Sequence, residues 1–401
     1  MTAWLSIVGI GEDGIEAISP SATRAIESAT LLVGGERHLA MLPEDERERK
    51  TWPSPLMILV NEIMARRGEK ICILATGDPM QYGIGVTFAK RLPAEEIAIF
   101  PSRSAFSLAA ARLGWDLART DTITLHGRPL EMIIPHLAPD ARILALSDSG
   151  ETPSRVAHLL TSRGLGESVM AVLEHMGGAR EGIHQGTADQ FAGKSFRDFN
   201  TIAVHCPPQS NAKMYPSIPG LADEAFEHDG QLTKREVRSA TLSALGPFPG
   251  QLLWDIGAGC GSVAIEWMRC DPRNRAIAVE ARKDRFDLIE KNRVNLGVPQ
   301  LKTLNATAPD ALVGLEAPDA IFIGGGLNVE GIFEASWKAL KPGGRLVANA
   351  VTIEGEQRLF QLHDSYDGAL TRLNYSRAEK IGGFTSWKPF RQITQLRLVK
   401  E

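Results

Sequence analysis

A glycine-rich turn in mid-chain constrains the fold more than any other feature of this sequence. An apolar run ends in Gly257, and Gly259 and Gly261 complete a G-x-G-x-G spacing. A second apolar run at 276–279 closes on Glu280. In an open parallel sheet, such glycines let the backbone approach a nucleoside, and an acid at the tip of the next strand accepts hydrogen bonds from the ribose hydroxyls. The pattern therefore predicts an α/β domain with an adenosine site at these strand ends.

The spacing of the glycines also separates two classes of cofactor. Dinucleotide sites of this kind carry G-x-G-x-x-G and hold a diphosphate at the start of the following helix. This turn reads G-x-G-x-G, and no diphosphate-cradling pattern accompanies it. The turn therefore favours S-adenosylmethionine over a dinucleotide. We interpret Cys260, within the turn, as a small residue that packs beneath the cofactor rather than as a reactive thiol.

Length and composition fit a protein of two globular domains. The chain has 401 residues, of which 43% are hydrophobic and 23% are charged, so it can build two full cores. Its net charge of −4 provides no basic field for nucleic acid or an anionic membrane. We therefore expect neither as a partner, and an anionic substrate would need local arginines and lysines.

The cysteines and the apolar segments exclude further classes. Cys72, Cys206, Cys260 and Cys270 form no C-x-x-C pair and no zinc spacing, which predicts a reducing compartment and no metal site. The apolar stretch at the N-terminus is too short for a signal peptide. No window approaches the ~18–20 apolar residues of a membrane span. We therefore expect a cytoplasmic α/β protein.

A polar, proline-rich stretch at 207–220 is typical of a linker, and it predicts domains at 1–206 and 221–401. On both sides apolar runs alternate with helical patterns, which predicts mostly parallel sheets. In the first domain we expect strands at 4–8, 31–33, 70–75, 142–146, 169–173 and 201–205 and helices at 21–29 and 105–113. In the second we expect strands at 252–256, 276–279, 320–323, 345–350 and 392–399, the last at a sheet edge, and helices at 234–245, 262–269, 283–296 and 329–340.

The motif order of the second half resembles the class I methyltransferase domain. After the glycine turn and Glu280 come 305–309 (NATAP), 319–326 (DAIFIGGG) and 340–346 (LKPGGRL). The resemblance implies a Rossmann-like class I fold that aligns S-adenosylmethionine with a nucleophile and excludes water. It implies cofactor contacts for a set of residues at strand ends, namely Thr233, Asp255, Gly257, Ala258, Gly259, Gly261, Glu280, Ala306 and Gly324.

The start of the second half carries a narrower resemblance. Residues 223–226 (DEAF) and 232–238 (LTKREVR) are similar to the decarboxylating precorrin methyltransferases of cobalamin biosynthesis. That resemblance implies a polycarboxylate substrate, for which cations at the opening of a helix would act as carboxylate clamps. These cations are Lys234, Arg235 and Arg238. Without the resemblance they would be interpreted as a solvated helix face. We also expect Thr233 and Glu236 to form a capping box for this helix.

The first domain opens on a literal G-x-G-x-x-G at 9–14. A dinucleotide site is one interpretation, but Glu12 and Asp13 would place two carboxylates beside a diphosphate, and no acid follows the next strand. The domain instead resembles the tetrapyrrole methylase (class III) family. The matching segments are 32–35 (LVGG), 76–83 (TGDPMQYG), 101–106 (PSRSAF), 109–114 (AAARLG) and 126–128 (HGR). Arg103 and the Glu12-Asp13 turn depart from the usual pattern of that family.

The class III resemblance implies a second S-adenosylmethionine site of unrelated architecture, in which the donor lies folded between two subdomains. The glycine and proline around Asp78 shape a loop whose backbone amides can face the methionine part of the donor. The residues on cofactor-contact positions are Thr76, Gly77, Asp78, Gln81, Ser104, Ala105 and Met176. The candidates for substrate carboxylates are Arg103, His126 and Arg128. His175 is left open between a cofactor contact and a packed histidine.

Together the two resemblances are those of the fused, two-domain decarboxylating precorrin methyltransferases. They imply that an anionic tetrapyrrole is methylated at carbon 15 and decarboxylated at its ring C acetate by the second domain, and methylated at carbon 5 by the first. They also imply one S-adenosylmethionine site in each domain. A reduced macrocycle is an electron-rich enamine that needs no strong base, so the sequence names no catalytic residue.

Two other interpretations remain open at this point. One is a methyltransferase for another small substrate, with the N-terminal domain as a binding module. The other is a nucleotide-binding oxidoreductase built on the two glycine-rich turns. We also expect a homo-oligomer, with the apolar residues 381–384 and Trp387 as candidate contacts between subunits.

Overall fold

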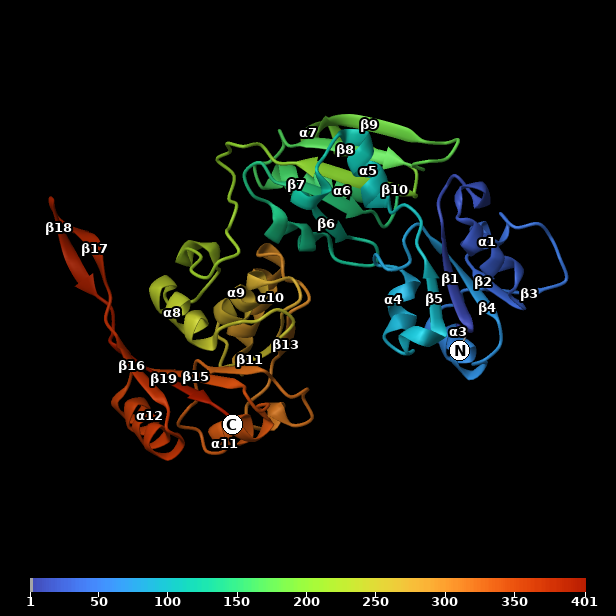
Figure 1. Cartoon of the computed structure of the whole chain (residues 1–401). Helices are drawn as coiled ribbons and strands as arrows, with labels where there is room; N and C mark the ends of the chain where they lie inside the picture. Colours follow the sequence, from blue (N-terminus) through green and yellow to red (C-terminus); the bar gives the residue numbers. More distant parts are fainter. Residues whose placement is uncertain (1–2) are drawn as a thin grey trace. The chain divides into compact units, whose positions relative to one another are not determined.

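The computed structural model describes residues 3–401, which divide into two compact units. The first unit includes the chain up to residue 130 and residues 139–213, and the second includes residues 131–138 and 214–401. Each unit consists of strands flanked by helices (Figure 1). Within residues 3–401 no helix is long and apolar enough to cross a membrane.

The first unit contains two five-stranded sheets. The first sheet has the order β3-β2-β4-β1-β5, and all its neighbours are parallel. Its strands are β1 (Leu5–Ile10), β2 (Leu31–Gly34), β3 (Glu48–Thr51), β4 (Ile71–Thr76) and β5 (Ile97–Phe100). Its helices are α1 (Pro20–Glu27), α2 (Glu36–Leu39), α3 (Met57–Ala65) and α4 (Ile84–Ala89). Alternate strand residues pack against α3 and α4 on one face and against α1 on the other, as expected for a sheet buried on both sides.

The second sheet of this unit is mixed and has the order β6-β7-β10-β8-β9. Its strands are β6 (Asp121–Thr124), β7 (Arg142–Leu146), β8 (Val169–Glu174), β9 (Gly182–Thr187) and β10 (Asn200–His205). Its helices are α5 (Ala105–Leu113), α6 (Thr152–Ser162) and α7 (Ala188–Phe191). Phe106 and Ala109 of α5 pack against Leu144 and Leu173 of the sheet. The loops of both sheets can therefore meet within a single unit.

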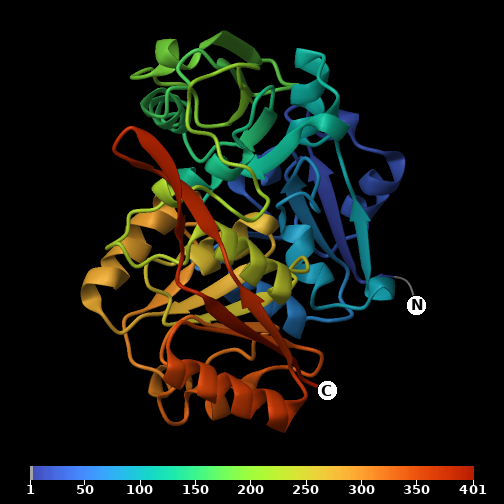
Figure 2. The ribbon, with the colours of Figure 1, turned by 90° about the vertical axis from the view of Figure 1, so that its left-hand side faces the viewer.

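The second unit is built on a seven-stranded sheet of order β13-β12-β11-β14-β15-β19-β16. Its strands are β11 (Leu252–Ile256), β12 (Arg275–Val279), β13 (Lys302–Leu304), β14 (Ala320–Ile323), β15 (Arg345–Ala350), β16 (Ala369–Leu373) and β19 (Ile393–Val399). Its helices are α8 (Arg235–Leu245), α9 (Ser262–Cys270), α10 (Lys283–Asn295), α11 (Ile332–Ala339) and α12 (Ile353–Tyr366). Two separate cores place α8–α10 on one face and α11 and α12 on the other (Figure 2).

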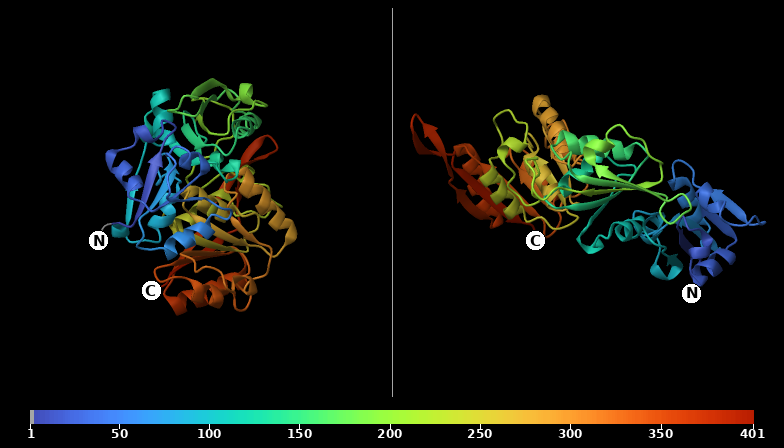
Figure 3. Two further views of the ribbon diagram at one scale, coloured as in Figure 1. Left: turned by 90° about the vertical axis from the view of Figure 1, so that its right-hand side faces the viewer. Right: turned by 90° about the horizontal axis from the view of Figure 1, so that it is seen from above.

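The strands and helices expected from the sequence are confirmed, with most ends shifted by no more than two residues. Two expectations are wrong. The second sheet of the first unit is not mostly parallel, because only β6 and β7 pair in parallel there. In the second unit, β19 does not lie at the edge of its sheet. It pairs antiparallel with β15 on one side and with β16 on the other, so β16 takes the edge. The strands β17 (Ser376–Ile381) and β18 (Phe384–Pro389), which the sequence did not predict, form a hairpin that projects from this sheet (Figures 2 and 3).

Candidate active sites

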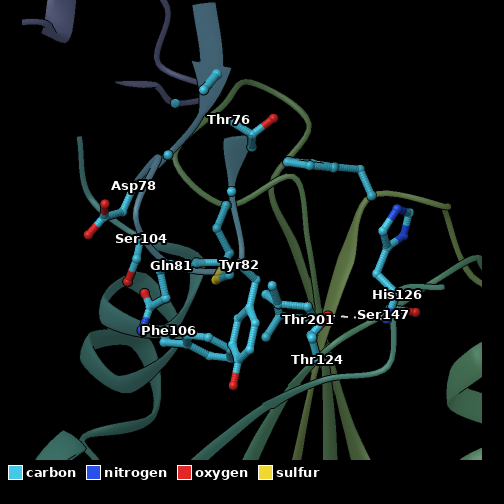
Figure 4. Close-up of a pocket in the computed structure, with 18 of the residues that line it drawn as sticks. Thr76, Asp78, Gln81, Tyr82, Ser104, Phe106, Thr124, His126, Ser147 and Thr201 are labelled. Atoms are coloured by element: carbon cyan, nitrogen blue, oxygen red, sulfur yellow. Dashed lines mark hydrogen bonds between the residues drawn. The ribbon is translucent and has the colours of Figure 1, made fainter. Parts of the chain in front are cut away.

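The first unit contains a cavity of about 730 Å³ whose wall is built from loops of both its sheets. In Figure 4, Asp78, Ser104 and Gln81 lie on one side, and His126, Thr124, Ser147 and Thr201 lie on the other. Ten sequence-predicted site residues line this cavity: Thr76, Gly77, Asp78, Gln81, Arg103, Ser104, Ala105, His126, Arg128 and Met176. The fold therefore brings together residues that are up to 100 positions apart in the chain.

The loop after β4 exposes backbone groups to this cavity. Gly77 has a φ of +56°, a conformation that glycine adopts without steric cost. The carboxylate of Asp78 accepts a hydrogen bond of 2.8 Å from the N–H of Met80 and so stiffens the turn. Across the cavity wall, Ser104 caps α5, and its hydroxyl accepts from the N–H of Ser107 at 3.1 Å. Backbone amides and small side chains leave room for a polar ligand here.

The three candidate cations of the first unit lie at the cavity but differ in their partners. Arg103 is exposed and forms an ion pair with Asp13. His126 is also exposed, with Nδ1 3.2 Å from a carboxylate oxygen of Asp148. The guanidinium of Arg128 stacks 5.6 Å from the ring centre of Tyr82. Exposed cations of this kind can exchange a surface partner for a ligand carboxylate at little cost.

Many wall residues escaped the sequence reasoning, among them Glu12, His38 and Tyr82. Glu12 lines the cavity from the loop after β1, and His38 lines it from helix α2. Tyr82 also lines it, with a φ of +59° and its hydroxyl donating to the carbonyl of Thr122 at 3.1 Å. A bulky residue in this backbone region is uncommon and is often found at functional sites. For Tyr82 a signal was available, because it belongs to the same TGDPMQYG segment as Asp78.

In the second unit, the glycine-rich turn follows β11 in a conformation that requires its glycines. Gly257, Gly259 and Gly261 have φ values of +69°, +60° and +81°. The N–H groups of Gly257 and its neighbour donate to the carbonyl of Val279 at the end of β12. A Cβ at Gly257 would stand only 2.9 Å from the backbone nitrogen of Gly325. Two strand-end loops therefore approach each other closely enough that only backbone fits between them.

Glu280 ties this turn to the end of β12. One carboxylate oxygen accepts from the N–H of Gly259 at 2.8 Å, and the other accepts from the N–H of Arg282 at 2.9 Å. The side chain is buried, so it holds a fixed place beside the turn. Each oxygen keeps a further lone pair, which fits the carboxylate for the ribose hydroxyls of a nucleoside.

Asp255 lies at the end of β11 with an exposed fraction of 1%. Its Oδ2 accepts from the N–H of Ala264 at 3.0 Å, at the start of α9, and its Oδ1 has no partner. Burial, together with a smaller contribution from the nearby Glu280, raises the pKa of this carboxyl to about 7. Asp255 therefore holds the strand to the helix and leaves one polar atom buried without a partner beside the turn.

The remaining cofactor candidates of the second unit lie on neighbouring loops. Gly324 follows β14, and its N–H donates to the carbonyl of Ile256 at 3.0 Å. Ala306 is exposed and follows Asn305, whose side chain donates to the carbonyl of Glu280 at 2.9 Å. Together with the orphaned oxygen of Asp255 and the cradle at Gly257, these loops fit an adenosyl ligand. Burial raises the pKa of the Cys260 thiol to about 11, which agrees with a packed rather than a reactive cysteine.

The expected clamp role of Arg238 is wrong. Its side chain is fully buried, with Nε 2.6 Å from a carboxylate oxygen of Glu266 and further bonds to Asp223 and to the carbonyls of Thr233 and Leu221. The guanidinium therefore donates its hydrogen bonds to acceptors of the protein itself, not to a substrate carboxylate. Lys234 and Arg235, by contrast, are partly or largely exposed at the start of α8.

The expected capping box is also wrong. The N-cap residue of α8 is Lys234, and it forms no side-chain cap. Glu236 instead accepts two hydrogen bonds, at 3.2 and 2.7 Å, from the guanidinium of Arg377 on β17. Thr233 contributes its carbonyl to Arg238 rather than a hydroxyl to the helix. The carboxylate of Glu236 therefore pairs with Arg377, which is distant in the sequence, and does not cap the start of α8.

Two α/β units with candidate site residues in loops at strand ends, one of them with a glycine turn and a buried acid suited to a nucleoside, fit the class of S-adenosylmethionine-dependent methyltransferases. Residues 5–192 match the family of tetrapyrrole (corrin/porphyrin) methylases, and residues 224–400 match the precorrin methyltransferase domain. A precorrin-6Y C(5,15)-methyltransferase [decarboxylating] of Sinorhizobium sp is 46% identical over 98% of this chain and 96% of its own length. The chain belongs to the family of decarboxylating precorrin-6Y C(5,15)-methyltransferases.

Two further relatives are similar to this chain. A protein of the same name from Mycobacterium tuberculosis is 38% identical over 98% of this chain and 99% of its own length. Among solved structures, the C-terminal domain of precorrin-6Y C5,15-methyltransferase from Rhodobacter capsulatus is 43% identical, covers 46% of this chain and all of that one, and has a TM-score of 0.44.

Proposed function

We propose that this chain methylates a precorrin at carbons 5 and 15 and removes the ring C acetate as carbon dioxide, in the biosynthesis of cobalamin. The single observation that carries the proposal is the full-length relationship to proteins named for this activity, 46% identical over 96% of the relative. The second domain would act at carbon 15 and in the decarboxylation, and the first at carbon 5. Each domain would bind its own S-adenosylmethionine.

The proposed reaction requires the chain mainly to bind the methyl donor and the macrocycle and to align them. The donor supplies an electrophilic methyl group on sulfur. The glycine turn at Gly257 and the loop at Gly77 offer backbone groups that can position it, and a reduced macrocycle supplies its own electron-rich carbon. When the chain holds the methyl group in line with the ring carbon, the reaction no longer depends on a bimolecular encounter, and this accounts for much of the rate enhancement.

The first test is the mass of the product. Purified chain is incubated with S-adenosylmethionine and precorrin-6Y, the substrate for which the relatives are named, and the product is analysed by mass spectrometry. We expect a gain of two methyl groups and the loss of one carbon dioxide. If precorrin-6Y is unchanged while S-adenosylhomocysteine binds, the chain is a methyltransferase for another small substrate and the proposal is wrong. Binding of NADH in place of S-adenosylhomocysteine would indicate an oxidoreductase.

The second test counts the cofactor sites. Calorimetry with S-adenosylhomocysteine should give two sites for each chain. The variant Asp78→Ala should abolish one methylation, and Gly259→Arg, at a φ of +60°, should abolish the other. A stoichiometry of one, or the loss of both methylations in each variant, would argue against a separate site in each domain.

Our candidates for the substrate carboxylates remain Arg103, His126 and Arg128 in the first unit and Lys234 and Arg235 in the second. A charge-assisted hydrogen bond to a partly desolvated carboxylate contributes ~1.5–3 kcal/mol. Arg128→Ala should therefore raise the KM for the precorrin about tenfold or more. An unchanged KM in both Arg128→Ala and Arg235→Ala would exclude the clamps.

We also propose the domain limits 1–206 and 221–401, joined by 207–220. This is supported by the change from one compact unit to the other after residue 213 and by family matches that end at 192 and resume at 224. A homo-oligomer is supported by the exposed apolar tip of the β17–β18 hairpin, with Ile381, Phe384 and Trp387. A cytoplasmic location is supported by the thiols of Cys72, Cys260 and Cys270, which form no disulfide, since disulfides persist mainly in oxidising compartments.

A further inference from the structure

A buried acid and a buried histidine meet across the cavity of the first unit. Glu12 follows β1 of the first sheet, and His175 follows β8 of the second. A carboxylate oxygen of Glu12 lies 2.9 Å from Nδ1 of His175, and the two side chains are only 8% and 9% exposed. Both residues line the cavity. Burying such a pair is costly unless its geometry is good, so it calls for an explanation.

Other side chains hold Glu12 and His175 in place. Arg37 donates to the second oxygen of Glu12, and its guanidinium stacks 4.4 Å from the ring centre of Phe199. The ring of His175 packs 5.7 Å from the same phenylalanine. A Cβ at Gly178 would stand 2.9 Å from that of Glu12, so the acid is confined from that side as well. The pair therefore has little freedom to rearrange.

The chain of contacts continues to a predicted cofactor residue. Arg37 lies 3.3 Å from Nε2 of His38, and the same ring nitrogen lies 3.3 Å from the hydroxyl of Thr76. Burial, and then the charge of Arg37, lowers the pKa of His38 to about 4, which keeps that ring neutral. A connected polar network thus runs from the end of β4 to the loop after β8.

The geometry also determines which nitrogen of His175 carries a proton. Against a carboxylate, Nδ1 must be the donor, so in the neutral ring the lone pair resides on Nε2. Nε2 has no hydrogen-bond partner in the described part of the chain, and the residue lines the cavity. An acid that orients a histidine through Nδ1 and leaves Nε2 available is the arrangement of a general base.

The charges around His175 favour the neutral ring. Burial is the largest cause that lowers its pKa, followed by Arg180 and Arg197, with a smaller contribution from Arg37. Glu174 raises it. Glu12 contributes the opposing carboxylate on the facing loop. These surroundings therefore favour the neutral ring, which is the form that can accept a proton.

Other histidine–carboxylate pairs of the first unit lack these features. His205 and Asp140 lie 2.7 Å apart outside the cavity, with the acid 70% exposed. His126 pairs with Asp148 at 3.2 Å in an exposed setting. Pairs of that kind form on many protein surfaces and contribute little. The pair at Glu12 differs because it is buried, spans two sheets and faces the cavity.

We propose that Nε2 of His175 accepts the proton released when the first unit methylates its substrate, and that Glu12 is the residue that positions it. This proposal rests on the proposed function. A bond forms between the meso carbon and the methyl group as the sulfur–carbon bond breaks, and its electron pair stays on sulfur, leaving a neutral thioether. The enamine thereby becomes an iminium cation, which returns to neutrality by releasing a proton. His175 takes that proton, and the resulting imidazolium beside Glu12 passes it to water.

The first test needs no turnover. Nitrogen-15 spectra of the full-length protein, with the His175 signals assigned by their loss in His175→Asn, should show a proton on Nδ1 and a titration midpoint below the usual ~6.5. In Glu12→Gln the amide can donate to Nδ1, so the proton should move to Nε2. A proton on Nε2 in the wild type would overturn the proposal.

The second test separates a proton acceptor from a structural contact. His175→Asn retains an N–H near the position of Nδ1 and tolerates the φ of +45° found there, but it has no equivalent of Nε2. We expect its rate of carbon 5 methylation to fall 100-fold or more, with S-adenosylhomocysteine affinity and Tm close to wild type. The wild-type rate should rise with pH through the titration of His175, and this dependence should be absent in the variant.

A matched control is His205→Asn, from the exposed pair outside the cavity, whose rate should stay within twofold of the wild type. A rate within threefold in His175→Asn would overturn the proposal, as would a large loss of S-adenosylhomocysteine affinity, since that would make His175 a cofactor contact. If the wild type transfers no methyl group to carbon 5 although S-adenosylhomocysteine binds, the proposed function itself fails, and the proton acceptor fails with it.

Discussion

Replacing Arg238 by alanine should destabilise the second unit without a selective effect on substrate binding. The guanidinium is 0% exposed and its main partner, Glu266, is 2% exposed. Glu266 also accepts hydrogen bonds from the N–H groups of Gly220 and Leu221, at 2.6 and 3.0 Å. Arg238 in turn donates to the carbonyl of Leu221. The pair thus fastens the segment before α8 to helix α9.

The magnitude follows from what the substitution leaves behind. Arg238→Ala would bury the carboxylate of Glu266 without its cation and would remove a donor from Asp223, which is also buried. Removing one partner of a buried ion pair costs about 3–5 kcal/mol, because the other charge stays desolvated. Since neither group reaches solvent, screening by water does not reduce this figure. The cavity left by the side chain adds to the cost.

Urea unfolding of the full chain, followed by tryptophan fluorescence, measures this loss. The matched control is Arg275→Ala, which breaks a surface pair with Glu316 at 2.6 and 2.7 Å whose side chains are 51% and 54% exposed. That change should cost less than about 1 kcal/mol. At a temperature where Arg238→Ala is folded, its KM for the precorrin should be unchanged. If Arg238→Ala loses no more stability than the control and its KM rises tenfold, this reasoning is wrong and Arg238 binds a substrate carboxylate after all.

Three further predictions concern the second unit. The pKa of Asp255 in the folded chain is raised from 3.8 to about 7, so its contribution to stability is complete below pH ~4 and is lost as the pH rises through ~7. The free energy of unfolding should therefore fall by on the order of 4 kcal/mol over that range. Asp255→Asn should reduce this pH dependence in urea titrations at pH 5 and pH 8.5, and an unchanged pH dependence would contradict the prediction. Asn292 bonds the backbone N–H and carbonyl of Glu227 and the carbonyl of Cys260, so Asn292→Ala should cost about 3 kcal/mol, at ~1 kcal/mol for each bond, against little effect for the exposed Lys291→Ala. Gly257→Ala, with its Cβ forced against a neighbouring loop, should reduce the calorimetric stoichiometry of S-adenosylhomocysteine from two to one; two intact sites would show that the turn tolerates a side chain.

Several of the strands that the sequence predicted are buried along most of their length. The strand at Leu252–Ile256 is buried throughout, so its apolar run is unbroken and its limits were predicted without error. The hairpin strands β17 and β18 are largely exposed, so they leave no periodic signal. The edge position expected for Ile393–Val399 failed for a related reason: the exposed β16 that covers it is mostly polar on the outside.

The candidate site was predictable where its residues form local motifs and unpredictable where it depends on distant partners. Gly77 and Asp78 were identified because the residues of the turn after β4 are consecutive in the sequence. The role of Arg238 depends on Glu266, which lies on another helix and is read from sequence as an ordinary helix residue. Glu12 depends on His175, which is 163 positions away. Neither pairing leaves a trace in the spacing of its own neighbourhood.

The two glycine-rich motifs, at 9–14 and 257–261, meet different structural requirements. Gly257 lies in a turn, where its absent side chain lets one strand-end loop approach Gly325. Gly9 belongs to the literal G-x-G-x-x-G, yet it lies inside strand β1, and a Cβ there would stand 1.8 Å from the carbonyl oxygen of Gly77. Gly9 leaves room for the loop that follows the neighbouring strand β4, and Glu12 directs its carboxylate to His175. Two carboxylates at this turn disfavour a diphosphate, so the charges of the motif argue against the dinucleotide site that its glycine spacing alone would predict.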